Sequence, residues 1–157
     1  YTALSYTCRY PKLEIIEYLF TTYHTHPIFY DEILSLKRYY KPAWYTFLLT
    51  CRDGTDEIIY SFFKRVFLPI LLTRNKSNDY LGLTPLHIAY IHRNTYHQYS
   101  YQRTGEQILS FLLSIPELVA LDGNTPDKFG TLPHQCPAVP NRYYRNKENC
   151  NIPYESK

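Results

Sequence analysis

The chain has 157 residues, of which 45% are hydrophobic and 20% are charged, a composition sufficient for one globular domain with an apolar core. Its net charge of +3 at pH 7 is too small to favour nucleic acid as a partner. The longest apolar run, over residues 66–72, contains Pro69 and is too short to span a membrane. Tyrosine is abundant, at 18 residues, and suits half-buried packing and protein interfaces.

The cysteines are widely spaced and form no C-x-x-C pair: Cys8, Cys51, Cys136 and Cys150. This spacing argues against a disulfide framework and fits a reducing compartment. Because the first residues do not resemble a signal peptide, we expect an intracellular protein, cytoplasmic or nuclear. The chain has no methionine and begins at Tyr1, where the cap of a first helix is expected. We therefore expect it to be a fragment of a longer protein.

A pattern in the first half of the chain repeats after 43 residues. Residues 2–9 and 13–20 form two apolar segments, and the same arrangement recurs at 45–52 and 56–63. The apolar residues of each second segment fall on one helical stripe. We expect each unit to be a helix pair that buries this stripe against its neighbours. The matching residues are Cys8–Arg9 with Cys51–Arg52, and Glu14–Ile16 with Glu57–Ile59.

Extra chain separates the expected helix pairs in three places. Residues 24–42 include a stretch that predicts an added helix over 32–38 with Asp31 as its N-cap. Residues 64–79 lengthen the exit from the second pair, and residues 90–105 widen the turn within the third. We interpret these segments as insertions into a repeated unit.

The octet Gly82–Ala89 predicts the start of a helix. Thr84 can accept a hydrogen bond from an unpaired N–H of the first turn, and Pro85 suits the first helical position. His87 lies at the third position, from which a polar side chain can reach back to the cap. Residues 107–113 then carry isoleucine and leucines on one stripe, which predicts a second helix for this unit.

A weaker helix start follows at residues 127–136, where Leu132–Pro133 replaces a threonine–proline pair. Pro137 and Pro140 come directly afterwards, and proline does not continue a helix interior. We expect about one helical turn here. The polar residues 137–157 are expected to form a poorly ordered tail.

The sequence T-P-L-H-x-A at Thr84–Ala89, with Gly82 before it and an I-L-x-x-L-L helix after it, resembles an ankyrin repeat. The resemblance implies an all-α, helix-turn-helix repeat solenoid over residues 1–136, with about three full repeats and a truncated fourth. The repeats are expected at about 1–23, 43–66, 80–115 and 127–136. A helical bundle and a tetratricopeptide array are the alternative folds.

The resemblance also implies a protein–protein interaction scaffold that binds a partner through its loop tips and first-helix face. The segment 90–103 alternates aromatic, cationic and amide residues, types that are enriched in binding hot spots. A solvated loop and a single-strand nucleic-acid site are alternative interpretations of this segment. The expected partner-binding residues are Asp79, Tyr80, Leu83, Arg93, Tyr96, Tyr99, Tyr101, Arg103, Asp127 and Lys128.

No pattern in the sequence indicates catalysis, since it contains no G-x-S-x-G nucleophile motif and no phosphate-binding glycine loop. His134, Cys136 and Cys150 supply three soft ligands but lack an evident fourth for zinc. We therefore expect no enzyme activity, no cofactor and no metal. The alternative function is a structural subunit, or a fragment of a larger multidomain protein.

Overall fold

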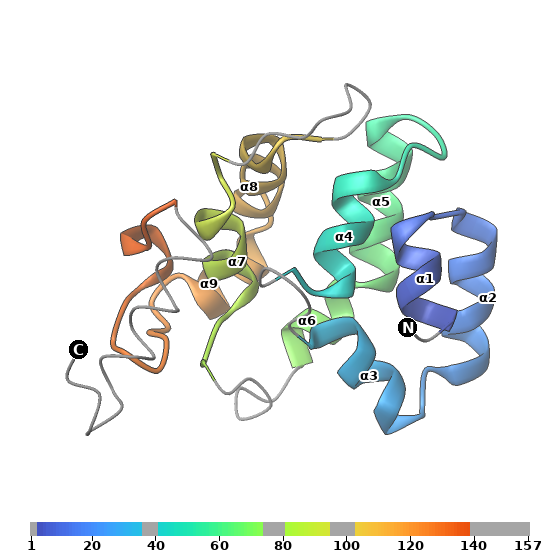
Figure 1. Cartoon of the computed structure of the whole chain (residues 1–157), viewed down its shortest axis with the longest axis horizontal. Helices are drawn as coiled ribbons and strands as arrows, with labels where there is room; N and C mark the ends of the chain where they lie inside the picture. Colours follow the sequence, from blue (N-terminus) through green and yellow to red (C-terminus); the bar gives the residue numbers. More distant parts are fainter. Residues whose placement is uncertain (1–2, 36–40, 74–80, 95–102, 139–157) are drawn as a thin grey trace, which may run out of the picture.

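The computed structural model describes residues 3–35, 41–73, 81–94 and 103–138. Every regular element in these ranges is a helix, so the expectation of an all-α chain is confirmed. The main elements are helix pairs that follow one another from the N-terminal end, at the right of Figure 1, towards α9. Unit 1 is α1 (Ala3–Arg9) with α2 (Leu13–Tyr23), unit 2 is α4 (Ala43–Thr50) with α5 (Asp56–Val66), and unit 3 is α7 (Pro85–Ile91) with α8 (Gly105–Leu113).

Short capping motifs determine where the helices of unit 3 begin. The Thr84 hydroxyl accepts a hydrogen bond from the His87 N–H at 3.2 Å, and the Thr84 N–H donates to His87 Nδ1 at 3.1 Å. This reciprocal capping confirms the start predicted at Pro85. Thr104 and Gln107 form the same kind of box at the start of α8. Both helices therefore satisfy part of their unpaired first-turn N–H groups locally.

The centre of the core is α4, whose residues are almost all buried. Unit 1 packs on one side of this helix through α1, and α8 contacts it on the other. A helix covered on both sides loses its polar face, which accounts for the apolar sequence of α4. Large side chains fill the space around it, including Trp44, Phe47, Phe63 and Phe67, each no more than 2% exposed.

The helix predicted over 32–38 with Asp31 as its cap is wrong. The added helix is α3 (Pro27–Leu34), and Asp31 lies inside it. Pro27 occupies the first turn, where its missing N–H costs nothing, and His26 Nδ1 accepts a hydrogen bond from the Ile28 N–H at 3.3 Å. His26 therefore caps the helix, which begins before Asp31.

One further helix follows unit 2 and another follows unit 3 along the chain. Helix α6 (Leu68–Thr73) follows α5 directly, and α9 (Pro116–Asp122) follows α8. Neither was predicted as a separate helix. The single helical turn expected near the fourth helix start is confirmed as the 3-10 helix η3 (Pro133–Gln135).

The added helices pack along the units. Helix α3 contacts α1 and α4, and α6 contacts α5 and α9. Both lie along the lower edge of the pairs in Figure 1. Among the described residues, no helix combines the length and the apolar character required to cross a membrane.

Candidate functional site

Units 1 and 2 are joined by polar contacts as well as by apolar packing. Arg65 of α5 forms a two-pronged ion pair with Glu17 of α2, with N–O distances of 2.7 and 2.8 Å. The Thr50 hydroxyl donates to the Cys8 carbonyl at 3.2 Å. These contacts bring the second helices together and tie the carboxyl end of α4 to that of α1.

Arg103 joins units 2 and 3 from a buried position, with 6% of the residue exposed. Its Nη1 donates to the Leu48 and Cys51 carbonyls at 2.9 and 2.5 Å. Its backbone N–H donates to the Leu49 carbonyl at 3.2 Å. The last carbonyls of a helix lack partners within it and carry partial negative charge. Arg103 therefore caps the carboxyl end of α4 from the next unit.

The Arg103 guanidinium also reaches α5. Its Nη2 lies 2.6 Å from Asp56 Oδ1, and its Cζ lies 5.4 Å from the centroid of the Tyr60 ring. The Tyr60 ring stacks on Phe111 of α8, with centroids 3.9 Å apart. Cationic, ionic and aromatic contacts thus meet between α5 and α8.

His87 joins unit 3 to the segment that follows it. Its Nδ1 accepts from the Thr84 N–H, and its Nε2 donates to the Thr131 carbonyl at 2.7 Å. Asp127 Oδ1 accepts from the N–H groups of Phe129 and Thr131 at 2.8 and 2.9 Å. Asp127 therefore stabilises the turn, and this turn places the Thr131 carbonyl within hydrogen-bonding distance of His87.

Two glycines permit close backbone approach around unit 3. Gly82 has a φ of +70°, and a Cβ there would lie 2.9 Å from Lys128 N. The neighbouring Leu81 carbonyl accepts a hydrogen bond from that N–H at 2.9 Å. A Cβ at Gly105 would lie only 1.7 Å from the His92 carbonyl oxygen, so α8 begins against the carboxyl end of α7.

His87, Asp127 and Cys136 form the closest group of possible metal ligands among the described residues, with ligand atoms within 4.8 Å of one another. The hydrogen bonds of His87 engage both of its ring nitrogens. Cys136 Sγ donates to the Leu132 carbonyl at 3.7 Å. The two ring nitrogens of His87 and one carboxylate oxygen of Asp127 therefore already form hydrogen bonds that hold the turn in place. Cys150, considered earlier as a ligand, lies outside the described residues.

Three of the five predicted partner-binding residues that the structure describes are buried. Leu83, Arg103 and Asp127 are 7%, 6% and 6% exposed, so their side chains serve internal contacts. They are corrected from surface residues to structural ones. Lys128 is exposed and Arg93 is half-buried. The remaining predicted residues lie outside the described ranges: Asp79, Tyr80, Tyr96, Tyr99 and Tyr101.

Arg93 also connects units, although it retains some exposure. Its Nη1 donates to the carbonyls of Tyr90 and Cys136, each at 2.7 Å. Arg93 therefore ties the end of α7 to the turn after η3. No local sequence signal identified this role or that of Arg103, because the carbonyl partners lie at distant positions in the chain.

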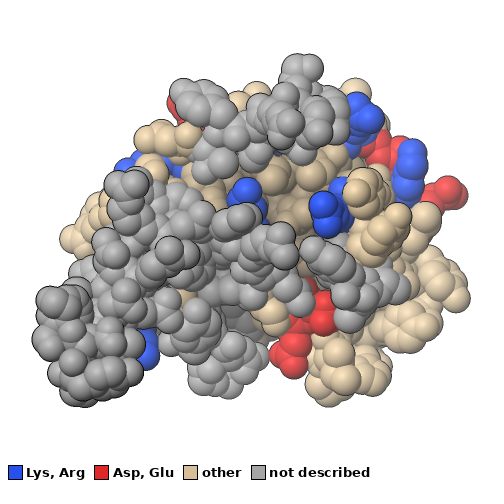
Figure 2. Space-filling view, viewed as in Figure 1, with Lys and Arg blue, Asp and Glu red and all other residues tan. Residues whose placement is uncertain are grey.

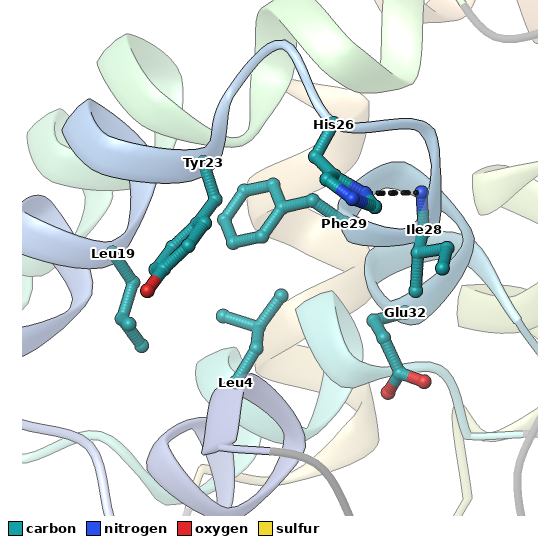
Figure 3. A pocket seen from close by; sticks show the side chains of 7 residues that line it. All are labelled: Leu4, Leu19, Tyr23, His26, Ile28, Phe29 and Glu32. Atoms are coloured by element: carbon teal, nitrogen blue, oxygen red, sulfur yellow. Dashed lines mark hydrogen bonds between the residues drawn. The ribbon is translucent and has the colours of Figure 1, made fainter.

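An apolar pocket that sequence reasoning missed lies at the N-terminal end of the stack, among α1, α2 and α3. Its volume is about 290 Å³. Figure 3 shows its side chains surrounding an open space, with the His26–Ile28 hydrogen bond at its margin. We call it the N-terminal pocket. It is lined by Leu4, Leu19, Tyr23, His26, Ile28, Phe29 and Glu32.

Exposed apolar side chains surround this end of the molecule. Tyr18, Tyr23 and Ile28 are 65%, 48% and 60% exposed. In Figure 2 the surface at the lower right, over the region of α1–α3, is largely uncharged. Apolar pockets and exposed apolar patches are common features of binding sites. Only the abundance of tyrosine in the sequence pointed towards such a surface.

Comparison of the chain with protein-family models, with curated proteins and with solved structures finds no match.

Proposed function

We propose that this chain is a protein–protein interaction scaffold built as an ankyrin-type stack. The proposed stack has about three full helix pairs and a truncated fourth within residues 1–136. In such an array each unit contacts mainly its neighbours, and the repetition creates an extended surface for partners. The proposed role is binding, without catalysis.

The observation that carries this proposal is the repeated register of the contacts between units. Phe20 of α2 meets Phe67 beyond α5, with ring centroids 5.0 Å apart. Phe63, which lies 43 residues after Phe20, meets Phe111 of α8 at 5.5 Å. Equivalent positions therefore contact the next unit in two successive pairs.

Polar contacts follow the same register. The Cys8 carbonyl accepts from unit 2, and the Cys51 carbonyl, 43 residues later, accepts from Arg103 of the next segment. Glu17 pairs with Arg65, while Tyr60 at the same offset stacks on Phe111. A repeated unit with a repeated contact pattern supports a solenoid over an irregular bundle.

Two side chains with reactive groups, Cys8 and His87, are buried within the fold, which supports a non-enzymatic role. Burial, assisted by the neighbouring Cys51, raises the pKa of the Cys8 thiol to about 12. A thiol held protonated is a poor nucleophile. The imidazole of His87 has both nitrogens engaged in internal hydrogen bonds. These groups do not form a nucleophile and base of the kind that covalent catalysis requires.

The proposed partner surface includes Lys128 at its turn and the tyrosines at 96, 99 and 101. Tyrosine is well suited to this role because it contributes a large contact area at low entropic cost. A structural role within a larger multidomain protein or assembly is the second candidate.

Affinity capture from an extract of the source organism tests the proposal. The baits are the folded chain, a variant with Tyr96, Tyr99 and Tyr101 changed to alanine, and the unfolded chain. We expect a protein retained by the folded chain alone and reduced at least about tenfold with the triple variant. Equal recovery on folded and unfolded baits would contradict a scaffold role. Undiminished recovery on the triple variant would remove the tyrosines from the partner surface.

A further inference from the structure

Two histidines at the junction between α2 and α3 use the same ring nitrogen in opposite ways. His24 is the C-cap residue of α2, and its Nδ1 lies 3.2 Å from the Thr21 carbonyl oxygen. A carbonyl oxygen only accepts, so His24 Nδ1 donates and carries a proton. His26 is the N-cap residue of α3, and its Nδ1 accepts a hydrogen bond from the Ile28 N–H. His26 Nδ1 therefore lacks a proton, and the two neutral imidazoles are opposite tautomers.

Protonation affects these two contacts differently, because both nitrogens of an imidazolium are donors. His24 keeps its hydrogen bond, and its charge lies at the carboxyl end of a helix, where a cation is favourable. His26 loses its acceptor, and its charge lies at the amino end of a helix, where a cation is unfavourable. Histidine gains this proton between about pH 8 and pH 5. Acidification over this range therefore strengthens the end of α2 and weakens the start of α3.

The described groups around His26 offer little compensation for an added positive charge. The first turn of α3 contains no acidic residue. Among the described residues that line the N-terminal pocket with His26, the titratable ones are Tyr23 of α2 and Glu32 of α3, and α1 contributes the apolar Leu4. Figure 3 shows the Glu32 carboxylate turned away from the His26 ring. A tyrosine hydroxyl carries no charge between pH 5 and pH 8.

The start of α3 forms part of the margin of the N-terminal pocket, since Ile28 and Phe29 both line it. Phe29 is 7% exposed, and its ring meets that of Phe20 edge-on with centroids 4.8 Å apart. Aromatic packing therefore holds Phe29 independently of the cap. Ile28 is 60% exposed, and its N–H is the group that His26 caps. Loss of the cap should therefore release the margin at Ile28 while the rest of α3 stays packed.

We propose that the junction between α2 and α3 is a pH-sensitive device. Neutral His26 fixes the margin of the N-terminal pocket at Ile28, and protonated His26 releases it. His24 holds the end of α2 in both states, because its contact survives protonation. This inference goes beyond the proposed function, since it assigns the fold a response to acid that requires no partner.

Nuclear magnetic resonance of the full ¹⁵N-labelled chain tests the proposal in two steps. Imidazole ¹⁵N shifts at pH 8 show which ring nitrogen carries the proton, and we expect Nδ1 for His24 and Nε2 for His26. Exchange of the Ile28 amide with water, divided by the intrinsic rate at each pH, then reports the opening of the first turn. We expect this ratio to rise about fivefold between pH 8 and pH 5, as loss of an N-cap predicts. The same tautomer in both rings, or a ratio that does not change with pH, would overturn the proposal.

His26→Asn separates this histidine from the other titrating groups. Asparagine is a favourable N-cap residue and does not titrate, so the exchange ratio at Ile28 should stay constant with pH. His24→Asn is the matched control, because it removes the neighbouring imidazole and leaves the cap of α3. Both histidines are exposed, so neither substitution disturbs the core. A pH response that persists in His26→Asn, or that is lost in His24→Asn, would overturn the assignment to His26.

Discussion

At the scale of single residues, His87 both caps its own helix and contacts the segment that follows unit 3. Its backbone N–H and Nδ1 cap the helix that contains it, and its Nε2 donates to Thr131 in the following segment. The side chain is fully buried. One imidazole thus sets both the start of α7 and the position of the next turn, and neither task leaves a ring nitrogen available for chemistry.

Replacing His87 by alanine should destabilise the chain by about 3 kcal/mol, since it removes buried hydrogen bonds and leaves a cavity. Urea unfolding followed by circular dichroism measures this change. His134→Ala serves as the control, because His134 is exposed and its loss should cost no more than about 0.5 kcal/mol. Equal unfolding midpoints for the two variants would contradict the role of His87.

Cys8 gives the fold a dependence on alkaline pH. Burial, assisted by Cys51, raises its pKa from 9.0 to about 12. The unfolded chain therefore loses this proton at lower pH than the folded chain. The contribution of Cys8 to stability is complete below pH 9 and declines as the pH rises towards 12. Comparison with Cys8→Ala should show the difference in unfolding free energy shrinking over this range. A constant difference would contradict the protonated thiol.

At the scale of helices, the contact between α2 and α5 includes a surface ion pair. The hydrogen bond from Arg65, opposed in part by slight burial, lowers the pKa of Glu17. The carboxylate is well exposed, so water screens the pair and its value is small. The contact aligns the two helices more than it stabilises them.

A double-mutant cycle with Glu17→Gln and Arg65→Met should give a coupling of about 0.5 kcal/mol at neutral pH. Because the pKa of Glu17 is lowered on folding, the coupling is complete above the ordinary glutamate range. It disappears as acid protonates the folded carboxylate. Chemical denaturation at neutral and acidic pH measures it. A coupling that persists in acid would contradict the ion pair.

The approach of α8 to α7 depends on Gly105, where a Cβ would overlap the His92 carbonyl. Gly105→Ala should force the helices apart and lower the free energy of unfolding by about 3 kcal/mol. Gly130 is a useful comparison, because its φ is +83° but a Cβ there meets nothing within 4 Å. Gly130→Ala should cost about 1 kcal/mol from backbone strain alone. Thermal unfolding would contradict this account if Gly130→Ala were the more damaging change.

The sequence analysis predicted the helices that are determined by capping residues and apolar stripes close together in the sequence. The Thr84–His87 box and the apolar stripes at 13–20, 56–63 and 107–113 correspond to helices in the structure. Helix α3 was misplaced because Asp31 is a common cap, whereas Pro27 and the unusual cap His26 determine its start. Helices α6 and α9 are short and each has proline in its first turn. The sequence analysis placed α6 in the exit from the second pair and predicted no helix over 116–122.

The candidate site was less predictable because the residues that contact one another there are far apart in the sequence. Arg103 was assigned to a partner surface from its residue type, yet its partners lie 47 to 55 residues earlier. Asp127 resembles a loop-tip residue but folds its own turn. The N-terminal pocket requires α1, α2 and α3 to meet, and the misplaced start of α3 concealed Ile28.

At the scale of the whole molecule, successive units are held by several kinds of contact. An ion pair and aromatic packing join units 1 and 2, and Arg103 with stacked rings joins units 2 and 3. His87 and Arg93 join unit 3 to the fourth segment. In the proposed repeat stack, the free energy of unfolding would be a sum of unit and interface terms. Disrupting one interface should therefore lower the stability of the neighbouring unit.

Unfolding of Arg103→Met, followed through Trp44, tests this coupling most directly. Trp44 is the single tryptophan of the chain and lies in α4 of unit 2, whereas Arg103 belongs to the segment that precedes α8. Since the substitution leaves the last carbonyls of α4 uncapped, we expect the free energy of unfolding to fall by about 2 kcal/mol. The Trp44 fluorescence midpoint should fall together with that of circular dichroism, while the exposed control Arg52→Met stays near wild type. A Trp44 transition unchanged from wild type would contradict a coupled stack of helix pairs.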